Sequence, residues 1–223
     1  MTKLYKIENI SKIYHRGSEE VKALNGISFS IETGEFVAIT GPSGSGKTTL
    51  LHILGCLDRP TIGEVLFNNR NVGKMSDKEL DNLRREKIGF VFQQFYLLPG
   101  LTVYENITLP LLFCRKAKQF EKDYIDEILN YLGIYNRKNH KPKELSGGEM
   151  QRVAIGRALI NKPDVILADE PTANLDSQNS LKIFELLKSL VNKGITVVVV
   201  THNNELAELA FRKIKLLDGK IIE

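Results

Sequence analysis

Short apolar runs alternate along the chain with longer stretches in which apolar residues recur every three to four positions. Continuous apolar runs are typical of buried parallel strands, and the longer stretches are typical of the helices that cover such a sheet. The runs that we expect to be core strands are 35–40, 88–93, 165–169 and 196–201. Leu181, Phe184 and Leu187 recur at helical spacing before Gly194, which predicts a core-facing helix with a glycine cap. The pattern predicts an α/β fold with a mostly parallel sheet.

The first third of the chain has a different pattern. The segments 4–10, 23–31 and 64–67 are short and β-like, and Gly, Asn and charged residues separate them. Such segments are typical of antiparallel strands, so we expect an N-terminal antiparallel β subdomain. A helical pattern over 119–132 predicts an inserted α-helical subdomain at about 95–160, within a single domain that spans residues 1–223.

A glycine-rich segment follows the first predicted core strand and opens a predicted helix. It fits the P-loop pattern G-x-x-x-x-G-K-[ST] and consists of Gly41, Pro42, Ser43, Gly44, Ser45, Gly46, Lys47 and Thr48, with Thr49 directly after it. Backbone N–H groups in such a loop surround phosphate groups, and the helix N-terminus adds positive charge. We expect Lys47 to reach the β- and γ-phosphates of a nucleotide and Thr48 to bind Mg²⁺ through its hydroxyl.

Two carboxylates end the predicted strand at 165–169. Ligands of parallel α/β sheets gather at the carboxyl ends of the strands, so Asp169 suits the Mg²⁺ shell of the same nucleotide. Glu170 lies one residue further on and is the candidate that orients or deprotonates the attacking water. The P-loop and these two acids together predict a P-loop NTPase core.

The tetrapeptide Leu145-Ser146-Gly147-Gly148 lies between the P-loop and Asp169-Glu170. Its sequence and its place in that order resemble the signature of the ABC ATPase family, and the resemblance covers essentially the whole chain. The resemblance implies an ABC ATPase fold, ATP hydrolysis, and ATP and Mg²⁺ as cofactors.

The resemblance also assigns roles to residues outside the P-loop and the strand ends. Gln93 matches the glutamine that touches Mg²⁺ and faces the transmembrane partner, and Tyr14 matches the aromatic residue that stacks on adenine. Asp176 lies in the segment 174–176, which is similar to the loop that crosses the family's dimer interface. His202 matches the histidine that contacts the γ-phosphate. We therefore expect Glu170, His202, Lys47 and Gln93 to be the catalytic residues.

The signature itself predicts a dimer. Ser146 is a good helix N-cap, and Gly147 and Gly148 leave the first helical N–H groups bare, which makes a second anion site. As in the family, two chains are expected to hold ATP between the P-loop of one and the signature of the other. Glu149 replaces the family's usual glutamine but completes a capping box with Ser146, and Asn203 stands where the family often has an acid.

Composition limits the remaining possibilities. The chain has 223 residues and a net charge of +4 from scattered Lys and Arg, which gives no reason to expect a nucleic acid partner. Cys56 and Cys114 lack metal-ligand spacing and are expected to be buried. The most apolar run, 195–200, is far shorter than a membrane span, so we expect another chain to hold this one at the cytoplasmic face of the membrane. The permease is expected to contact residues from Gln93 to Tyr104.

Two phrases, residues 55–60 and 88–95, resemble the ABC transporters that serve lipoprotein release, macrolide efflux and antimicrobial-peptide export. This resemblance implies a subunit that powers export or membrane extraction. The alternative is an ABC ATPase that regulates a membrane protein complex of the cell-division type without transporting. A soluble family member of the DNA-repair type is disfavoured, because Lys47 and Ser146 lie too close in the chain for the long coiled coil of those proteins.

Overall fold

Two β-sheets form the frame of the molecule in the computed structural model, which describes residues 2–17, 19–113 and 122–222. The larger sheet has the order β10-β9-β3-β8-β7-β6. Its neighbours from β9 to β6 pair in parallel, and β10 pairs antiparallel with β9. The strands are β3 (Phe36–Thr40), β6 (Ile88–Val91), β7 (Val165–Asp169), β8 (Thr196–Val200), β9 (Arg212–Leu217) and β10 (Lys220–Ile221). The predicted mostly parallel sheet is confirmed.

The central strands are buried on both faces. In β8, Val198 and Val200 join the apolar cluster on one face, while Val197 and Val199 join the cluster on the other. This alternation follows from the two-residue period of a strand, and it explains why Val197 to Val200 are all apolar. Burial of each such side chain contributes roughly 1.5–3 kcal/mol to folding.

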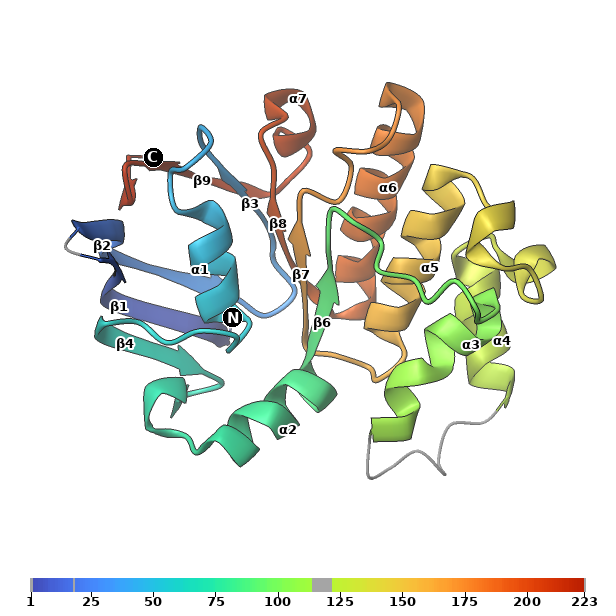
Figure 1. The fold of residues 1–223 in the computed structure, drawn as a ribbon, viewed down its shortest axis with the longest axis horizontal. Coiled ribbons are helices and arrows are strands. Elements are labelled where there is room, and N and C mark those ends of the chain that lie inside the picture. The colour runs from blue at the N-terminus through green and yellow to red at the C-terminus, as the bar shows by residue number, and fades with distance from the viewer. Residues whose placement is uncertain (1, 18, 114–121, 223) are drawn as a thin grey trace.

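The smaller sheet is antiparallel and is formed by the N-terminal third of the chain. Its order is β2-β1-β4-β5, and its strands are β1 (Lys3–Arg16), β2 (Glu19–Glu32), β4 (Ile62–Phe67) and β5 (Arg70–Asn71). The Tyr5 hydroxyl, fully buried, donates to the carbonyl of Leu54 at 2.8 Å and ties this sheet to the helix that follows the P-loop. The expected antiparallel β subdomain is therefore confirmed, and it lies beside that helix (Figure 1).

Helices cover both faces of the larger sheet (Figure 1). The helices on the side of the smaller sheet are α1 (Lys47–Leu54) and α2 (Asp77–Lys87), and those on the other side are α3 (Val103–Thr108), α4 (Lys122–Tyr131), α5 (Gly147–Leu159) and α6 (Ser177–Ser189). The short α7 (Asn204–Ala207) precedes β9. Short 3₁₀ segments occupy Val72–Lys74, Leu109–Phe113, Tyr135–Arg137, Pro142–Glu144 and Leu190–Lys193. None of the helices in the described ranges is long and apolar enough to cross a bilayer.

Several local predictions change. The strand expected at 88–93 ends at Val91, because β6 is an edge strand whose ladder with β7 ends at the pair Val91–Ala168. Leu181 is exposed, since the buried face of α6 carries Ile183, Phe184 and Leu187 instead. The first residues of the helix expected at 119–132 lie outside the described residues, and the bounds 95–160 for a helical subdomain stay a prediction.

One of the two cysteines, Cys56, lies in the described part of the chain. Cys56 is buried as expected, and burial raises the pKa of its thiol to about 11. Such a thiol is inert at neutral pH, because the thiolate is the reactive form. Cys114 lies outside the described residues.

Candidate functional site

A cavity of about 600 Å³ lies at the carboxyl ends of the parallel strands, where α/β sheets bind ligands. Of the site residues predicted from the sequence, those that line this cavity are Ser43, Gly44, Gly46, Lys47, Thr48, Thr49, Gln93, Glu170 and His202. The fold thus brings the P-loop together with residues that are far away in the sequence. Gly41, Pro42, Ser45 and Asp169 do not line the cavity themselves but lie next to residues that do.

The P-loop wraps tightly around the start of α1. Gly46 is the N-cap of that helix with a φ of 101°, and a Cβ built there would come within 2.3 Å of the carbonyl oxygen of Ala23. Lys47 is buried, and its Nζ donates to the carbonyls of Gly41 at 2.9 Å and Pro42 at 2.8 Å. The ammonium is therefore held over the loop, within reach of an anion that the loop would surround.

Thr48, which lines the cavity, lies next to Asp169. The Thr48 hydroxyl and the Asp169 carboxylate are 3.5 Å apart, and burial raises the pKa of Asp169. Among the described residues, no group of three or more His, Cys, Asp or Glu side chains is arranged to hold a metal. One carboxylate and one hydroxyl instead suit Mg²⁺, which binds through one or two carboxylates together with phosphate oxygens and water.

Glu170 and His202 form a pair across the ends of β7 and β8. The Nδ1 of His202 lies 2.9 Å from Oε2 of Glu170, and the backbone N–H of Glu170 donates to the carbonyl of Val200 at 3.0 Å. Glu170 has a φ of 46°, an uncommon value for a residue other than glycine. Glu170 pairs with His202 and Asp169 lies next to Thr48, so the two adjacent acids have different surroundings.

Asn203 follows His202 and has a structural role. Its side-chain oxygen accepts from the N–H of Leu206 at 3.1 Å and caps α7. Asn is as good an N-cap as Asp, so this departure from the family pattern keeps the helix start intact.

Gln93 is joined to the loop that follows Glu170. The Asn174 amide donates to the Gln93 carbonyl at 3.0 Å. The segment predicted to cross a dimer interface is therefore hydrogen-bonded to the residue predicted to face the permease.

Tyr14 lies beside the cavity rather than in its lining, although its cross-strand partner Val21 is a lining residue. The Tyr14 hydroxyl donates to Asp58 at 2.8 Å, and the Nζ of Lys12 lies 4.9 Å from the centre of the ring. The tyrosine is thus held on one side by a hydrogen bond and a cation–π contact.

The signature residues lie on a different part of the surface. The Ser146 side chain accepts from the N–H of Glu149 at 3.3 Å and begins α5, as predicted. A Cβ at Gly147 would lie 3.1 Å from the Leu175 side chain, so the signature and the 174–176 loop are neighbours. Asp176 itself caps α6 by accepting from the N–H of Asn179 at 2.8 Å. Ser146, Gly147, Gly148 and Asp176 do not line the P-loop cavity of their own chain.

The sequence pattern did not reveal several lining residues. They come from the start of β2 and from the β9–β10 turn, and they are Val21, Lys22, Ala23, Asp218 and Gly219. Backbone contacts bring them in: the Gly219 N–H donates to Ser45 O at 3.1 Å. No local motif marks such residues, although Asp218-Gly219 is a recognisable turn signal.

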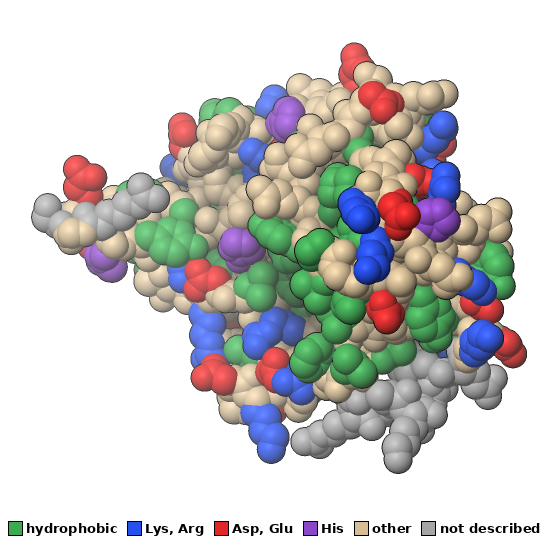
Figure 2. All heavy atoms as spheres, turned by 45° about the vertical axis from the view of Figure 1, so that its right-hand side comes forward, with side chains coloured by type: hydrophobic (Ala, Val, Ile, Leu, Met, Phe, Trp, Pro, Cys, Tyr) green, Lys and Arg blue, Asp and Glu red, His purple; other side chains and the backbone are tan. Residues whose placement is uncertain are grey.

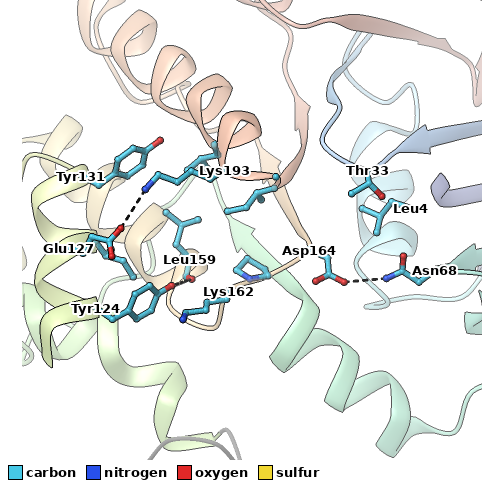
Figure 3. Close-up of a pocket in the computed structure, with 15 residues that line it drawn as sticks. Leu4, Thr33, Asn68, Tyr124, Glu127, Tyr131, Leu159, Lys162, Asp164 and Lys193 are labelled. Carbon is cyan, nitrogen blue, oxygen red and sulfur yellow. Dashed lines mark hydrogen bonds and ion pairs between the residues drawn. The ribbon is translucent and has the colours of Figure 1, made fainter. Parts of the chain in front are cut away.

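A second cavity of about 410 Å³ lies at the opposite, amino-terminal edge of the strands (Figure 3). Lys162 and Lys193 lie over the rings of Tyr124 and Tyr131, at 4.4 and 3.9 Å, and so join the loops of the core to α4. None of the residues predicted to bind nucleotide lines this cavity. The candidate site is therefore the P-loop cavity.

Comparison with known proteins agrees with this geometry. The family described as ABC transporter matches residues 24–173. The lipoprotein-releasing system ATP-binding protein LolD of Aquifex aeolicus is 47% identical over 222 residues, which cover 100% of this chain and 97% of that protein. The macrolide export ATP-binding/permease protein MacB of Bdellovibrio bacteriovorus is 50% identical over 215 residues, which cover 96% of this chain but 33% of that longer protein.

A solved structure extends the likeness to three dimensions. It is the dimeric structure of a post-hydrolysis state of the ATP-binding cassette MJ0796 of Methanocaldococcus jannaschii, bound to ADP and Pi. That chain is 48% identical to this one, with a TM-score of 0.87 and coverage of 98% of this chain and 97% of that chain. The chain described here belongs to the ABC transporter family.

Proposed function

We propose that this chain is the ATP-binding and ATP-hydrolysing subunit of a transporter that powers export or membrane extraction through a separate transmembrane subunit. The observation that carries the proposal is the meeting of Lys47, Glu170 and His202 in one cavity at the strand ends. The names of LolD and MacB, and the ADP and Pi bound to the dimeric cassette, support the same activity and direction.

The P-loop binds the triphosphate. Backbone N–H groups of residues 43–48 and the N-terminus of α1 surround the phosphate oxygens, and Lys47 leaves its carbonyl partners for the β- and γ-phosphates. Thr48, Asp169 and Gln93 would hold Mg²⁺, which would supply positive charge beside the phosphate oxygens.

Glu170 acts on the attacking water. It accepts a proton from the water while the water oxygen forms a bond to the γ-phosphorus and the bond from that phosphorus to the bridging oxygen breaks. His202 lies 2.9 Å from this carboxylate, holds it in place, and contacts the γ-phosphate. Because Glu170 is mostly buried beside the exposed His202, the base is shielded while the histidine remains accessible to the phosphate.

The complete site requires two copies of the chain. The N–H groups of Gly147 and Gly148 at the start of α5 receive the γ-phosphate of ATP bound to the P-loop of the second copy. The Ser146 hydroxyl joins them when it turns from Glu149 to the phosphate, while the Ser146 N–H stays with Glu149. Tyr14 stacks on adenine, and the loop of Asp176 crosses between the copies. The support is geometric: this second anion site is intact but lies outside the P-loop cavity of its own chain.

The transmembrane subunit docks on the face next to Gln93. Large apolar side chains are exposed there, namely Tyr96 (61%), Leu98 (45%), Leu112 (77%) and Phe113 (62%). Figure 2 turns the α3–α5 side forward and shows hydrophobic side chains gathered on that face. Exposed apolar groups in such a concentration mark an interaction surface. Docking there would hold the chain at the membrane, and we propose that it does so at the cytoplasmic face.

Hydrolysis tests the proposal directly. The purified chain should release phosphate from ATP in the presence of Mg²⁺, and removal of Mg²⁺ with a chelator should stop the release. Glu170→Gln should lower turnover by at least about 100-fold, since a general base contributes about 10²–10⁴. It should leave the binding of a fluorescent ATP analogue within a few-fold of the parent. Turnover of Glu170→Gln at the parent rate would refute the assignment of Glu170.

A further inference from the structure

Glu149 places a carboxylate in the first turn of α5, where the proposed function requires a second anion to bind. Its Oε2 accepts from the Ser146 N–H at 2.8 Å and from the Ser146 hydroxyl at 2.9 Å. The Ser146 N–H is the main cause of a lowered pKa of Glu149, so the group is ionised at neutral pH. The side chain is 27% exposed and therefore only partly screened by water.

A fixed negative charge at this position opposes the binding of phosphate. The N-terminus of a helix attracts one anion by its N–H groups and dipole, and Glu149 already uses part of that attraction. A neutral glutamine would make the same hydrogen bond to the Ser146 N–H without the repulsion. The acid therefore needs a compensating charge if the site is to receive a triphosphate.

Arg137 supplies that charge from the 3₁₀ turn Tyr135–Arg137. Its Nε donates to Oε1 of Glu149 at 2.9 Å, which leaves Oε2 to Ser146, so the two partners hold the two carboxylate oxygens separately. The Nη1 of Arg137 lies 3.3 Å from Nε2 of His140, which holds the guanidinium on its other side.

The turn that carries Arg137 is anchored to the protein. The N–H of Val103 donates to the carbonyl of His140, and the N–H of Tyr104 donates to the carbonyl of Lys138, both at 2.9 Å. The His140 N–H in turn donates to the carbonyl of Arg137 at 2.8 Å. The arginine is therefore presented from a fixed loop rather than from a free surface chain.

We propose that Arg137 is a positioning residue for the ATP-bound dimer: it holds Glu149 against Ser146 and offsets the Glu149 charge where the γ-phosphate of the second copy's ATP arrives. The inference rests on the shared-site function proposed above. It predicts that Glu149 weakens ATP-dependent dimerisation when Arg137 is absent.

The same three-residue arrangement occurs elsewhere in the chain and supplies a matched control. At the start of α2, Ser76 and Glu79 form a capping box, and Arg70 lies 3.0 Å from Glu79. That trio has no role in the proposed nucleotide site. Loss of Arg70 therefore measures what such an ion pair contributes to the stability of a helix start outside the nucleotide site, and for exposed pairs that contribution is small.

The experiment measures the ATP concentration that gives half-maximal dimer, by analytical ultracentrifugation with Mg²⁺ in a Glu170→Gln background. Adding Arg137→Gln should raise this concentration about tenfold, the order expected for uncompensated unit charges near a protein surface. Adding Arg70→Gln should leave it unchanged. Adding Glu149→Gln together with Arg137→Gln should restore it to within about twofold, because the charge that needed an offset is gone.

Salt provides a readout that a purely structural role would not change. The difference between Arg137→Gln and its background should shrink as ionic strength rises, because an unpaired charge is screened. Thermal unfolding of each variant, measured without nucleotide, shows whether the fold is kept. An unchanged ATP requirement in a folded Arg137→Gln variant, or no rescue by Glu149→Gln, would overturn the proposal. If the Glu170→Gln background itself never dimerises, the shared site fails, and the inference fails with it.

Discussion

At the scale of single residues, two P-loop glycines differ in why glycine is needed there. One position requires only an unusual backbone conformation, and the other also has no space for a side chain. Gly44 and Gly46 both have positive φ, 78° and 101°, which any other residue adopts at a cost. A Cβ on Gly44 meets nothing within 4 Å, whereas a Cβ on Gly46 would lie 2.3 Å from the Ala23 carbonyl oxygen. Gly46 therefore cannot change without moving β2 or the start of α1.

Alanine at these two positions should give different losses of stability. Gly44→Ala should lower the free energy of unfolding by about 1–2 kcal/mol, the cost of a left-handed residue. Gly46→Ala should lose about 1–3 kcal/mol more, because overpacking adds to the strain. Urea unfolding without nucleotide measures both. Equal losses for the two variants would show that the contact with Ala23 does not matter.

The residues of the site differ in how well the sequence alone could reveal them. Lys47 and Thr48 belong to a contiguous motif with a known geometry, and Asp169 and Glu170 end an apolar run, so both sets were predictable. Lys22 and Asp218 reach the cavity only through the pairing of distant strands, which no local pattern encodes. The ion pair of Arg137 with Glu149 likewise depends on how the turn before α5 folds back.

At the scale of elements, carboxylates that cap helix starts share one physical feature. Each accepts a backbone N–H bond that is the main cause of a lowered pKa; the residues are Glu79, Glu105, Glu144, Glu149 and Asp176. A lowered pKa in the folded state means that the ionised form favours folding. The pKa of Asp169 shifts in the opposite direction, because burial raises it.

These shifts predict how stability depends on pH. The capping carboxylates contribute their full stabilisation above the unfolded-state pKa, at about 4–4.5, and lose it as pH falls through their lower folded-state values. The stabilisation lost from the five capping carboxylates should exceed the destabilisation relieved at Asp169. The urea midpoint should therefore fall between about pH 5 and 3. Glu79→Gln should make this fall shallower. A midpoint that stays constant or rises on acidification would contradict the assignment.

The elements predicted from the sequence were those whose burial dictates their pattern. β3 and β8 are buried along their whole length, and β7 is buried except at Asp169, so their apolar runs define them almost to the residue. β1 and β2 extend to Arg16 and Glu19, well beyond the predicted segments. Their outer halves pair with each other but face solvent, so hydrogen bonding and not burial sets their length. A hydrophobic pattern carries no signal for such extensions.

At the scale of the whole molecule, the chain presents two half-sites on separate parts of its surface. The P-loop cavity is lined by Lys47, Thr48 and Glu170, the residues proposed to bind phosphate, Mg²⁺ and the attacking water, and the start of α5 carries the proposed second anion site. In the proposed dimer, the two half-sites of different chains together enclose the triphosphate. The sequence predicted both half-sites from local motifs, but their assembly depends on a second chain.

The most direct test of this account is the mass of Glu170→Gln in solution, measured by size-exclusion chromatography with light scattering. With ATP and Mg²⁺ the variant should shift from monomer to dimer, because unhydrolysed ATP joins the P-loop of one copy to the signature of the other. The shift should disappear without nucleotide and when Lys47→Ala is added. A variant that binds ATP but stays monomeric under all these conditions would contradict the shared site.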